Sequence, residues 1–217
     1  MIKNILHTVF TKFSSAGLGF LTIILISQIL GPQAKGEQAI LVYNINLLLM
    51  CFTLIGNSTL IYLVPRKDFN ALIIPSLLWV IIAAIIASIV FICFINAEVS
   101  YTLICILIAI LASISEINQF ILLGKQKISQ ANTLKFLYPL ISFSYIVILW
   151  LCNRFSGVED FVIAMFIAYI VSLFYGVFVL KDDYRNLKLL SKKELSESFK
   201  NLFKLGVTKQ TGYIAQS

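Results

Sequence analysis

Long apolar intervals alternate with short charged segments along the whole chain. The intervals between charges cover residues 13–34, 38–65, 69–97, 99–124, 136–153 and 161–180, and Glu116 is the single charge inside them. A helix needs about 20 residues to cross a hydrocarbon core about 30 Å thick, which the fifth interval meets narrowly. The intervals are continuously apolar, whereas the strands of a membrane barrel alternate in polarity. The pattern therefore predicts six membrane-spanning helices in an all-α polytopic bundle.

Composition supports this class. Hydrophobic residues make up 59% of the 217 residues and charged residues 12%, and the mean hydropathy is +0.94. A soluble fold of this size leaves too much surface in water to hide so many apolar side chains. The net charge of +7 does not indicate a nucleic-acid partner, because the apolar stretches between the charges are as long as a bilayer is thick.

The basic residues predict the orientation of the bundle. One set of connections, with the N-terminus, holds 13 Lys and Arg residues, seven of them in 181–204, whereas the opposite set holds only Lys35 and Arg154. Basic connections stay in the cytoplasm. We therefore expect a multi-pass protein of the bacterial inner membrane whose N-terminus and 181–204 segment are both cytoplasmic.

The C-terminal part predicts a surface helix followed by a further span. Ser191 and Glu194 form a capping-box pattern, which marks a helix start. Beyond it, apolar residues recur at helical spacing among lysines, as in a helix that lies on an anionic membrane surface; they are Leu195, Phe199, Leu202 and Gly206. We expect three parts: a transmembrane lobe over 1–180, a cytoplasmic amphipathic linker over 181–204, and the beginning of a truncated seventh span over 205–217. The chain is then one lobe of something larger.

Motifs for catalysis and metal binding are missing from the sequence. The cysteines Cys51, Cys93, Cys105 and Cys152 lie within the apolar intervals without CxxC spacing and are interpreted as packing residues. Neither a glycine-rich phosphate loop nor HExxH or GxSxG occurs. We expect no enzyme, no metal and no cofactor, and coupling to a proton or a sodium gradient is left open.

Several short motifs follow one another in an order that resembles a known family. Residues 29–36 read ILGPQAKG and are expected to form a turn at the end of the first span. Residues 56–58 read GNS before Arg66 and Lys67, and residues 123–127 read LGKQK before Asn132 and Pro139. This order is similar to the N-terminal half of the polysaccharide (O-antigen and oligosaccharide) flippases. That family is a branch of the superfamily that also contains the multidrug and toxin extrusion (MATE) transporters.

The resemblance implies a MATE-like, V-shaped transporter of two six-helix lobes around a central cavity. Its cargo is undecaprenyl-pyrophosphate-linked oligosaccharide for polysaccharide or lipopolysaccharide synthesis, moved between leaflets by alternating access. Partners would be this cargo, membrane lipids, and the polymerase and glycosyltransferases of the same pathway, but no nucleic acid. The chain departs from the pattern at Gln28, where many relatives are basic. The absence of charge in 13–34 argues against lipid II as the cargo.

The candidate cavity residues are the polar ones inside the spans. A buried ionisable group is costly, so Glu116 calls for a partner or a function. Gln119 follows three residues later on the same helical face, and Lys135 begins the fifth span. We interpret all three as lining a substrate cavity. The alternatives are an ion pair between Glu116 and Lys135, a neutral buried carboxyl, and a Lys135 that reaches the interface by snorkelling.

Asn46 and Asn57 share one face of the second span with Thr53, and the asparagines either bind a polar cargo or hydrogen-bond across helices. Arg66 and Lys67 are candidates for the cytoplasmic mouth, where a pyrophosphate would arrive; the alternative is an orienting role only.

Hinge candidates are Gly17, Gly19 and Pro139. The alternative for the two glycines is close helix packing, and for the proline an ordinary bend, because it leaves the carbonyl of Lys135 without an amide partner.

Three functions remain open at this stage. The first is the flippase, and the second is a cation-coupled multidrug extruder of the same superfamily, which would use a buried acid among aromatic side chains. The third is a non-transporting scaffold that gathers polysaccharide assembly enzymes. We also expect that the chain alone does not transport, because half a cavity cannot alternate between two openings.

Overall fold

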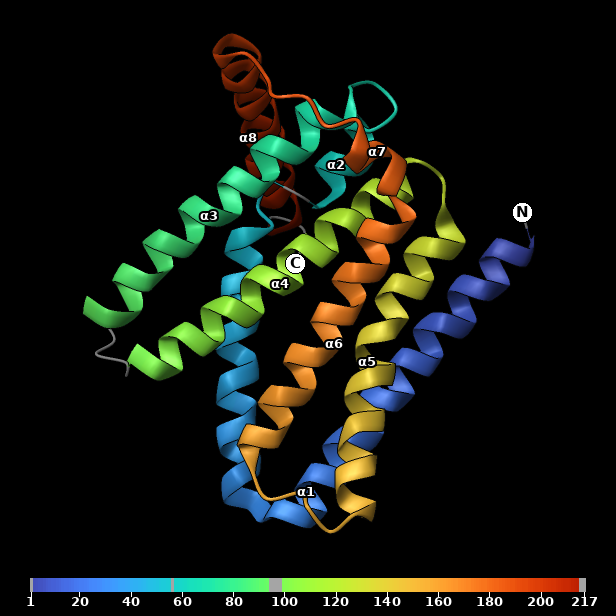
Figure 1. The fold of residues 1–217 in the computed structure, drawn as a ribbon, viewed down its shortest axis with the longest axis vertical. Coiled ribbons are helices and arrows are strands. Elements are labelled where there is room, and N and C mark those ends of the chain that lie inside the picture. Colours follow the sequence, from blue (N-terminus) through green and yellow to red (C-terminus); the bar gives the residue numbers. More distant parts are fainter. Residues whose placement is uncertain (1, 56, 94–98, 215–217) are drawn as a thin grey trace.

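The computed structural model describes residues 2–55, 57–93 and 99–214 (Figure 1). Within these ranges the chain is entirely helical and contains no strand, which confirms the all-α prediction for the described part. The helices are α1 (Ile2–Phe52), α2 (Asn57–Leu63), α3 (Phe69–Cys93), α4 (Val99–Gly124), α5 (Ile128–Leu151), α6 (Val158–Val179), α7 (Lys181–Arg185) and α8 (Lys192–Ile214).

Helix α1 consists of two arms joined by a sharp bend at Gly31. The first arm (residues 2–30) runs the length of the bundle to the bend, and the second arm (residues 32–52) runs back toward the starting end while diverging from the first, so that the two arms form a V (Figure 1). Gly31 has φ 76° and ψ −177°, a backbone region that is essentially restricted to glycine. Pro32 then occupies the first position of the second arm, where its missing N–H costs nothing. The turn predicted over residues 29–36 is confirmed.

Five helices are long and apolar enough to cross a membrane. They are Ile5–Ile29 within α1, Phe69–Cys93, Val99–Gly124, Ile128–Leu151 and Val158–Val179. The chain is therefore a multi-pass helical membrane protein. The remaining predicted interval, 38–65, is divided between the second arm of α1 and the short α2, with residues 53–55 outside both helices. A sixth span as one continuous helix is thus not confirmed.

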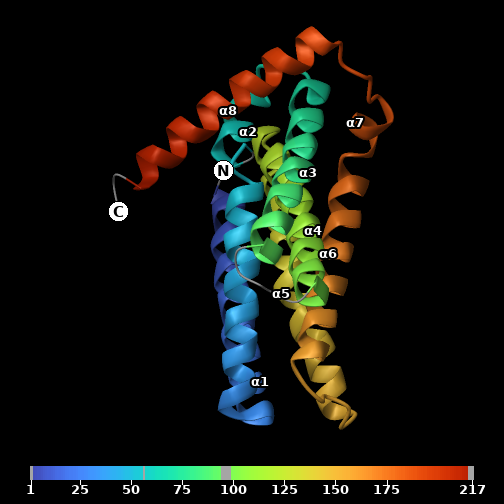
Figure 2. The same cartoon turned by 90° about the vertical axis from the view of Figure 1, so that its left-hand side faces the viewer.

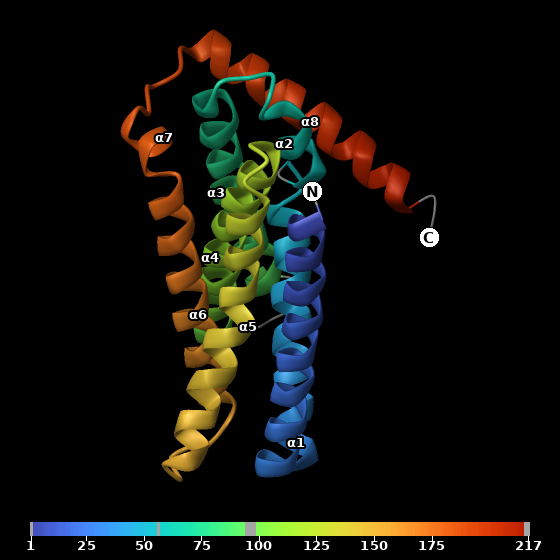
Figure 3. The same cartoon turned by 90° about the vertical axis from the view of Figure 1, so that its right-hand side faces the viewer.

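The connections gather at two ends of the bundle. The N-terminal end of α1, the α2–α3 and α4–α5 connections, α7 and the start of α8 lie at one end (Figures 1 and 3). The α1 bend and the α5–α6 connection lie at the opposite end. The segments predicted to share a membrane side are therefore found together in space.

Helix α4 is the centre of the bundle. It packs against α1, α2, α3, α5 and α6, and small residues on its buried faces, such as Ala109, Ala112 and Ser113, allow the neighbouring helices to approach closely. Gly176 of α6 is one such close approach, because a Cβ there would lie 3.1 Å from the Cβ of Asn118 in α4.

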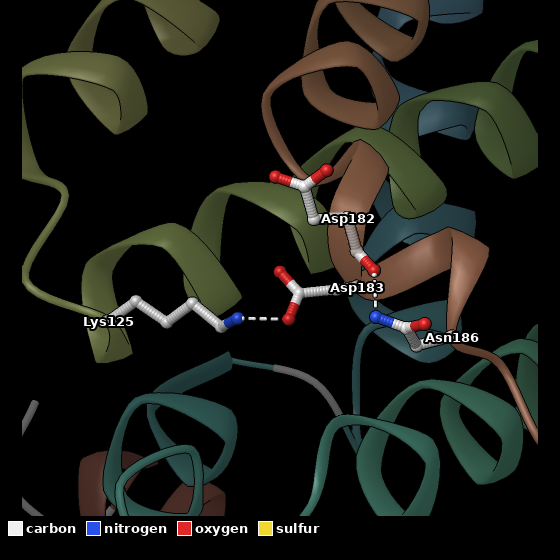
Figure 4. A network of polar contacts seen from close by, with 4 residues as sticks. All are labelled: Lys125, Asp182, Asp183 and Asn186. Atoms are coloured by element: carbon white, nitrogen blue, oxygen red, sulfur yellow. Dashed lines mark hydrogen bonds and ion pairs between the residues drawn. The ribbon is translucent and has the colours of Figure 1, made fainter.

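Polar contacts attach α7 to the bundle. Tyr184 donates a hydrogen bond of 2.7 Å to the amide oxygen of Asn118, and burial raises the pKa of this tyrosine to about 12. Lys125, after α4, forms an ion pair with Asp183 at 2.5 Å, and Asn186 donates to the backbone carbonyl of Asp182 (Figure 4). The chain after α6 is thereby held against the end of α4.

Helix α8 starts at the predicted capping box. The Ser191 N–H and hydroxyl both donate to the Glu194 carboxylate, at 2.9 and 2.7 Å, and these bonds lower the pKa of Glu194. The helix then crosses the end of the bundle and extends away from it (Figure 2). Helix α8 continues through residues 204–205 without a break, so the predicted linker (181–204) and the predicted start of a seventh span (205–217) are not separate helices in the described residues. The division of the chain into domains stays a prediction.

Helix α8 is docked on the gap between α1 and α2. Ser198 and Leu202 are buried, and a Cβ added to Gly206 would lie 2.5 Å from the carbonyl oxygen of Leu54. Trp79 of α3 donates its indole N–H to the carbonyl of Cys51 at 3.0 Å. Helix α8 therefore covers the helix ends at this gap, and Trp79 of α3 provides a hydrogen bond to one of their backbone carbonyls.

We predict that Gly31→Ala lowers the free energy of unfolding by about 1–3 kcal/mol, because an L side chain at this φ and ψ is strained. Thermal unfolding of the purified protein in detergent measures the change. Gly36→Ala is the matched control, because Gly36 is helical and a Cβ there meets nothing within 4 Å. Equal melting temperatures for the two variants would contradict the assigned bend.

Candidate functional site

A cavity of about 370 Å³ lies among the first arm of α1 and helices α4, α5 and α6, and several polar side chains line it together with a larger apolar surface. We call it the Glu116 cavity. It brings together four of the predicted residues from two helices, Glu116 and Gln119 of α4 with Lys135 and Pro139 of α5, and a fifth, Gly19, from α1. The structure therefore collects at one place side chains that are up to 120 positions apart in the chain, and their roles stay predictions.

A second cavity of about 470 Å³ adjoins the first. We call it the Lys35 cavity, because Lys35 and Gln38 of α1 line it together with Asn46. Gly19, Tyr138 and Pro139 line both cavities, so these residues form the boundary between them. Lys35 lies beside the α1 bend and donates a hydrogen bond to Gln38. The two cavities thus connect the interior of the bundle with the region of this bend.

The charged groups of the Glu116 cavity are not paired directly. No contact within 4.0 Å joins Glu116 to Lys135 in the described part of the structure, although the two groups interact through their charges over a longer distance; the alternative of a Glu116–Lys135 ion pair stays a prediction. Glu116 is partly buried, and Lys135 is exposed although it lines the cavity. Both charges are therefore open to a third group that enters between the helices.

Two serines add hydrogen-bonding capacity that the protein itself does not use. The hydroxyls of Ser15 and Ser172 are buried without a hydrogen-bond partner, and both residues line the Glu116 cavity. Buried polar groups are nearly always hydrogen-bonded to protein, water or ligand. These hydroxyls therefore suit a hydrated or polyhydroxylated occupant.

A stacked tyrosine pair was not predicted. The rings of Tyr138 and Tyr169 have centroids 4.4 Å apart and an interplanar angle of 22°, and both line the Glu116 cavity. The spacing held a signal, because Tyr138 follows Lys135 by three residues and Ser172 follows Tyr169 by three, so each pair shares a helical face. Aromatic faces and edges of this kind bind sugar rings through C–H contacts or cations through their π electrons.

The polar face of the second predicted span is not a continuous site. Asn46 lines the Lys35 cavity, whereas Thr53 donates to the carbonyl of Leu49 at 2.7 Å within its own helical turn. The side chain of Asn57 lies outside the described part of the structure. Only Asn46 of this face is therefore assigned to a cavity.

Arg66 and Lys67 lie away from both cavities. With Pro65 and Asp68 they line a separate depression in the α2–α3 connection. The Arg66 guanidinium donates to the carbonyl of Tyr62 at 2.6 Å and lies 4.0 Å above the Tyr62 ring. Arg66 and Lys67 therefore line neither of the two cavities. Their role at the cytoplasmic mouth of a transport path stays a prediction.

The hinge candidates separate into two groups. Gly19 and Pro139 line the cavities, whereas Gly17 is exposed and lines neither. A Cβ at Gly17 or Gly19 would meet nothing within 4 Å, so the alternative of close helix packing is wrong at both positions. Helix α5 continues through Pro139 as one helix.

Asn132 joins α5 to the start of α1. Its amide nitrogen donates to Thr8 Oγ1 at 2.7 Å and lies 3.4 Å from His7 Nδ1. In the described ranges, no group of three His, Cys, Asp or Glu side chains is arranged for a metal ion.

No family model matches the chain, and neither the curated proteins nor the solved structures contain a significant match to it. The class therefore rests on the structure alone: a multi-pass helical membrane protein with a cavity among its long helices that polar side chains help to line.

We predict that the Glu116 cavity contains water. In a background without native cysteines, Gln119→Cys should react with a charged thiosulfonate reagent, because the thiolate forms only where water solvates it. Adding Gly19→Leu should slow this reaction by about tenfold, because the new side chain displaces the cavity water.

Gly17→Leu is the matched control, because Gly17 belongs to the same helix but lines neither cavity. A Gln119→Cys variant that does not react, or an equal effect of the two leucines, would contradict a hydrated cavity bounded by Gly19.

Proposed function

We propose that the chain forms a six-span lobe in the bacterial inner membrane, with the N-terminus and α7 on the cytoplasmic side. In this proposal the second arm of α1 and α2 together make the second crossing. The gap at residues 53–55 is tolerated because α8 covers it and Trp79 binds the carbonyl of Cys51. Irregular backbone at membrane depth needs such protein partners.

The topology is testable with single cysteines in the background without native cysteines. Lys35→Cys should react with an impermeant maleimide added outside intact cells, whereas Lys188→Cys should react only after permeabilisation, because basic connections stay inside. Arg154→Cys is the control for the outer end. Labelling of positions 35 and 188 from the same side would exclude the six-span topology.

We infer that the lobe, as the N-terminal half of a two-lobe flippase, takes part in moving a lipid-linked oligosaccharide between leaflets. The single observation that carries this inference is the Glu116 cavity: carboxylate, amide, hydroxyl and aromatic groups face an open volume inside an apolar bundle. Such a site suits a sugar, which offers hydroxyls at its rim and C–H groups on its faces. The resemblance of the sequence motifs to polysaccharide flippases supports the same class of cargo.

The proposed roles follow from position. Glu116, Gln119 and the unpartnered Ser172 accept or donate hydrogen bonds to sugar hydroxyls, and the tyrosine pair stacks against a ring. Lys135 in the Glu116 cavity and Lys35 in the neighbouring one attract the pyrophosphate that joins lipid and sugar. Gly19 and Pro139 lie on the boundary between the cavities and act as hinges, at which the helices bend when the transporter changes from one opening to the other.

One observation favours a second candidate function, export of a cationic drug. Glu116 shares its cavity with Tyr138 and Tyr169, and an acid among aromatic rings attracts organic cations. The two candidates differ in what the cell loses when the cavity is blocked.

The test uses the gene for this chain in its own host. Deletion should stop surface polysaccharide and leave lipid-linked repeat units in the cytoplasmic leaflet, and wild type should restore export. Glu116→Gln should lower export by about tenfold or more, because a charged hydrogen-bonding group is lost from the site. Gly19→Leu should abolish export, and Gly17→Leu should preserve it.

Normal polysaccharide together with increased sensitivity to cationic dyes would overturn the flippase in favour of the drug exporter. If both cavity variants export normally while the chain still recovers glycosyltransferases in a pull-down, the protein is a scaffold.

A further inference from the structure

A groove of about 910 Å³ separates α8 from α3 at the outside of the bundle. Its floor is apolar and is made by Leu78 and Ile82 of α3 with Leu195, Phe199 and Phe203 of α8. Three lysines, Lys192, Lys200 and Lys204, line the same groove. It is separate from the Glu116 and Lys35 cavities, because it shares no residue with either.

The sequence of α8 builds this groove from three parallel rows of side chains, each repeating every four residues. Ser198, Leu202 and Gly206 form the buried row that docks on the α1–α2 gap. Leu195, Phe199 and Phe203 form the apolar row that faces the groove, and Lys192, Ser196, Lys200 and Lys204 form the polar row beside it. One helix therefore presents docking, apolar and basic rows in succession around its axis.

Aromatic contacts join α3 to α8 beside the groove. The Trp79 ring of α3 lies 6.2 Å from the ring of Phe199 and 5.6 Å from that of Phe203. The same indole is fixed by its hydrogen bond to Cys51. The inner wall between α3 and α8 is thus filled by rings, and the groove lies outside them.

The apolar floor continues beyond α8 along the membrane-spanning length of α3. Ile82 is 43% exposed, and Ile85, Ile86 and Ile89 further along the helix are exposed as well. Helix α8 crosses the end of the bundle where the basic connections gather (Figure 2). The lysines therefore lie at one end of an apolar track that leads into the membrane.

We propose that this groove binds one anionic phospholipid, with its phosphate at Lys192 and Lys200 and an acyl chain along Leu78 and Ile82. Charge complementarity selects this occupant. A neutral lipid would gain no electrostatic attraction from the lysines, and a soluble anion would bury no apolar surface on the groove floor. The acidic residues of α8 do not line the groove, because Glu194 is bonded to Ser191 and Glu197 lies outside it. The bound lipid would stabilise the position of α8 against α3, whatever the protein transports.

The experiment uses Trp79 as the reporter, since its ring contacts Phe199 and Phe203 of the groove and the chain has only two tryptophans. In a Trp150→Phe background, the full chain is reconstituted into phosphatidylcholine vesicles that contain brominated phosphatidylglycerol or brominated phosphatidylcholine. Bromine quenches tryptophan at short range. Phosphatidylglycerol should quench at about tenfold lower mole fraction, because each lysine near a phosphate adds electrostatic attraction.

Lys192→Gln with Lys200→Gln should abolish this preference. The matched control, Lys188→Gln with Lys193→Gln, removes the same charge from exposed lysines that do not line the groove, and it should keep the preference. Glycerol phosphate in solution should not displace the lipid.

Equal quenching by the two lipids would overturn the proposal, as would equal loss in both double variants, which would show general surface attraction. Displacement by glycerol phosphate would indicate a soluble anion site instead. Absence of quenching by either lipid would mean that protein covers the groove.

Discussion

The hydrocarbon interior of a membrane offers no hydrogen bonds to the backbone, and this constraint governs the whole architecture. The four long helices α3 to α6 satisfy it largely within themselves, except where Pro75 and Pro139 lack an N–H. The helical hydrogen bonding of α1 is interrupted at the Gly31 bend, and it ends at the gap before α2. The backbone groups freed at these two places have different surroundings. The bend lies at an end of the bundle, where its freed groups leave the apolar region. The gap before α2 is instead covered by α8, whose Gly206 lies against the Leu54 carbonyl, and is partly satisfied by Trp79. The tertiary positions of α3 and α8 are therefore consequences of a local break in α1.

The structural features that depend on residues close together in the sequence were predicted correctly. Apolar intervals located four complete spans and the first arm of α1, Gly-Pro at 31–32 located the bend, and Ser191 with Glu194 located the start of α8. Each of these features is encoded within a few neighbouring residues. The division of 38–65 was not predicted, because a break inside an apolar interval leaves hydropathy unchanged. The break is recognised only in the three-dimensional structure, where a distant group, the Trp79 indole N–H, donates a hydrogen bond to the carbonyl of Cys51.

The candidate site was predicted in its charged residues and missed in its aromatic ones. Glu116 and Lys135 stand out in apolar intervals, and both do line one cavity, yet no contact within 4.0 Å joins them in the described part of the structure. Tyr138 and Tyr169 are ordinary residues for a membrane span, and nothing local indicates that their rings stack. The sequence interpretation placed both residues in a cavity and left an ion pair between them open, because spacing along the chain does not give the distance between two helices. In the structure the helices keep these groups apart around a volume.

The hydrogen bonding of the cavity wall has a physical consequence for any occupant. A polar group already paired within the protein must lose its partner before it can bind a ligand, and the lost interaction subtracts from affinity. The hydroxyls of Ser15 and Ser172 carry no such hydrogen-bond partner within the described structure. A polar occupant of the cavity can therefore bond to these two hydroxyls without first breaking a hydrogen bond within the protein.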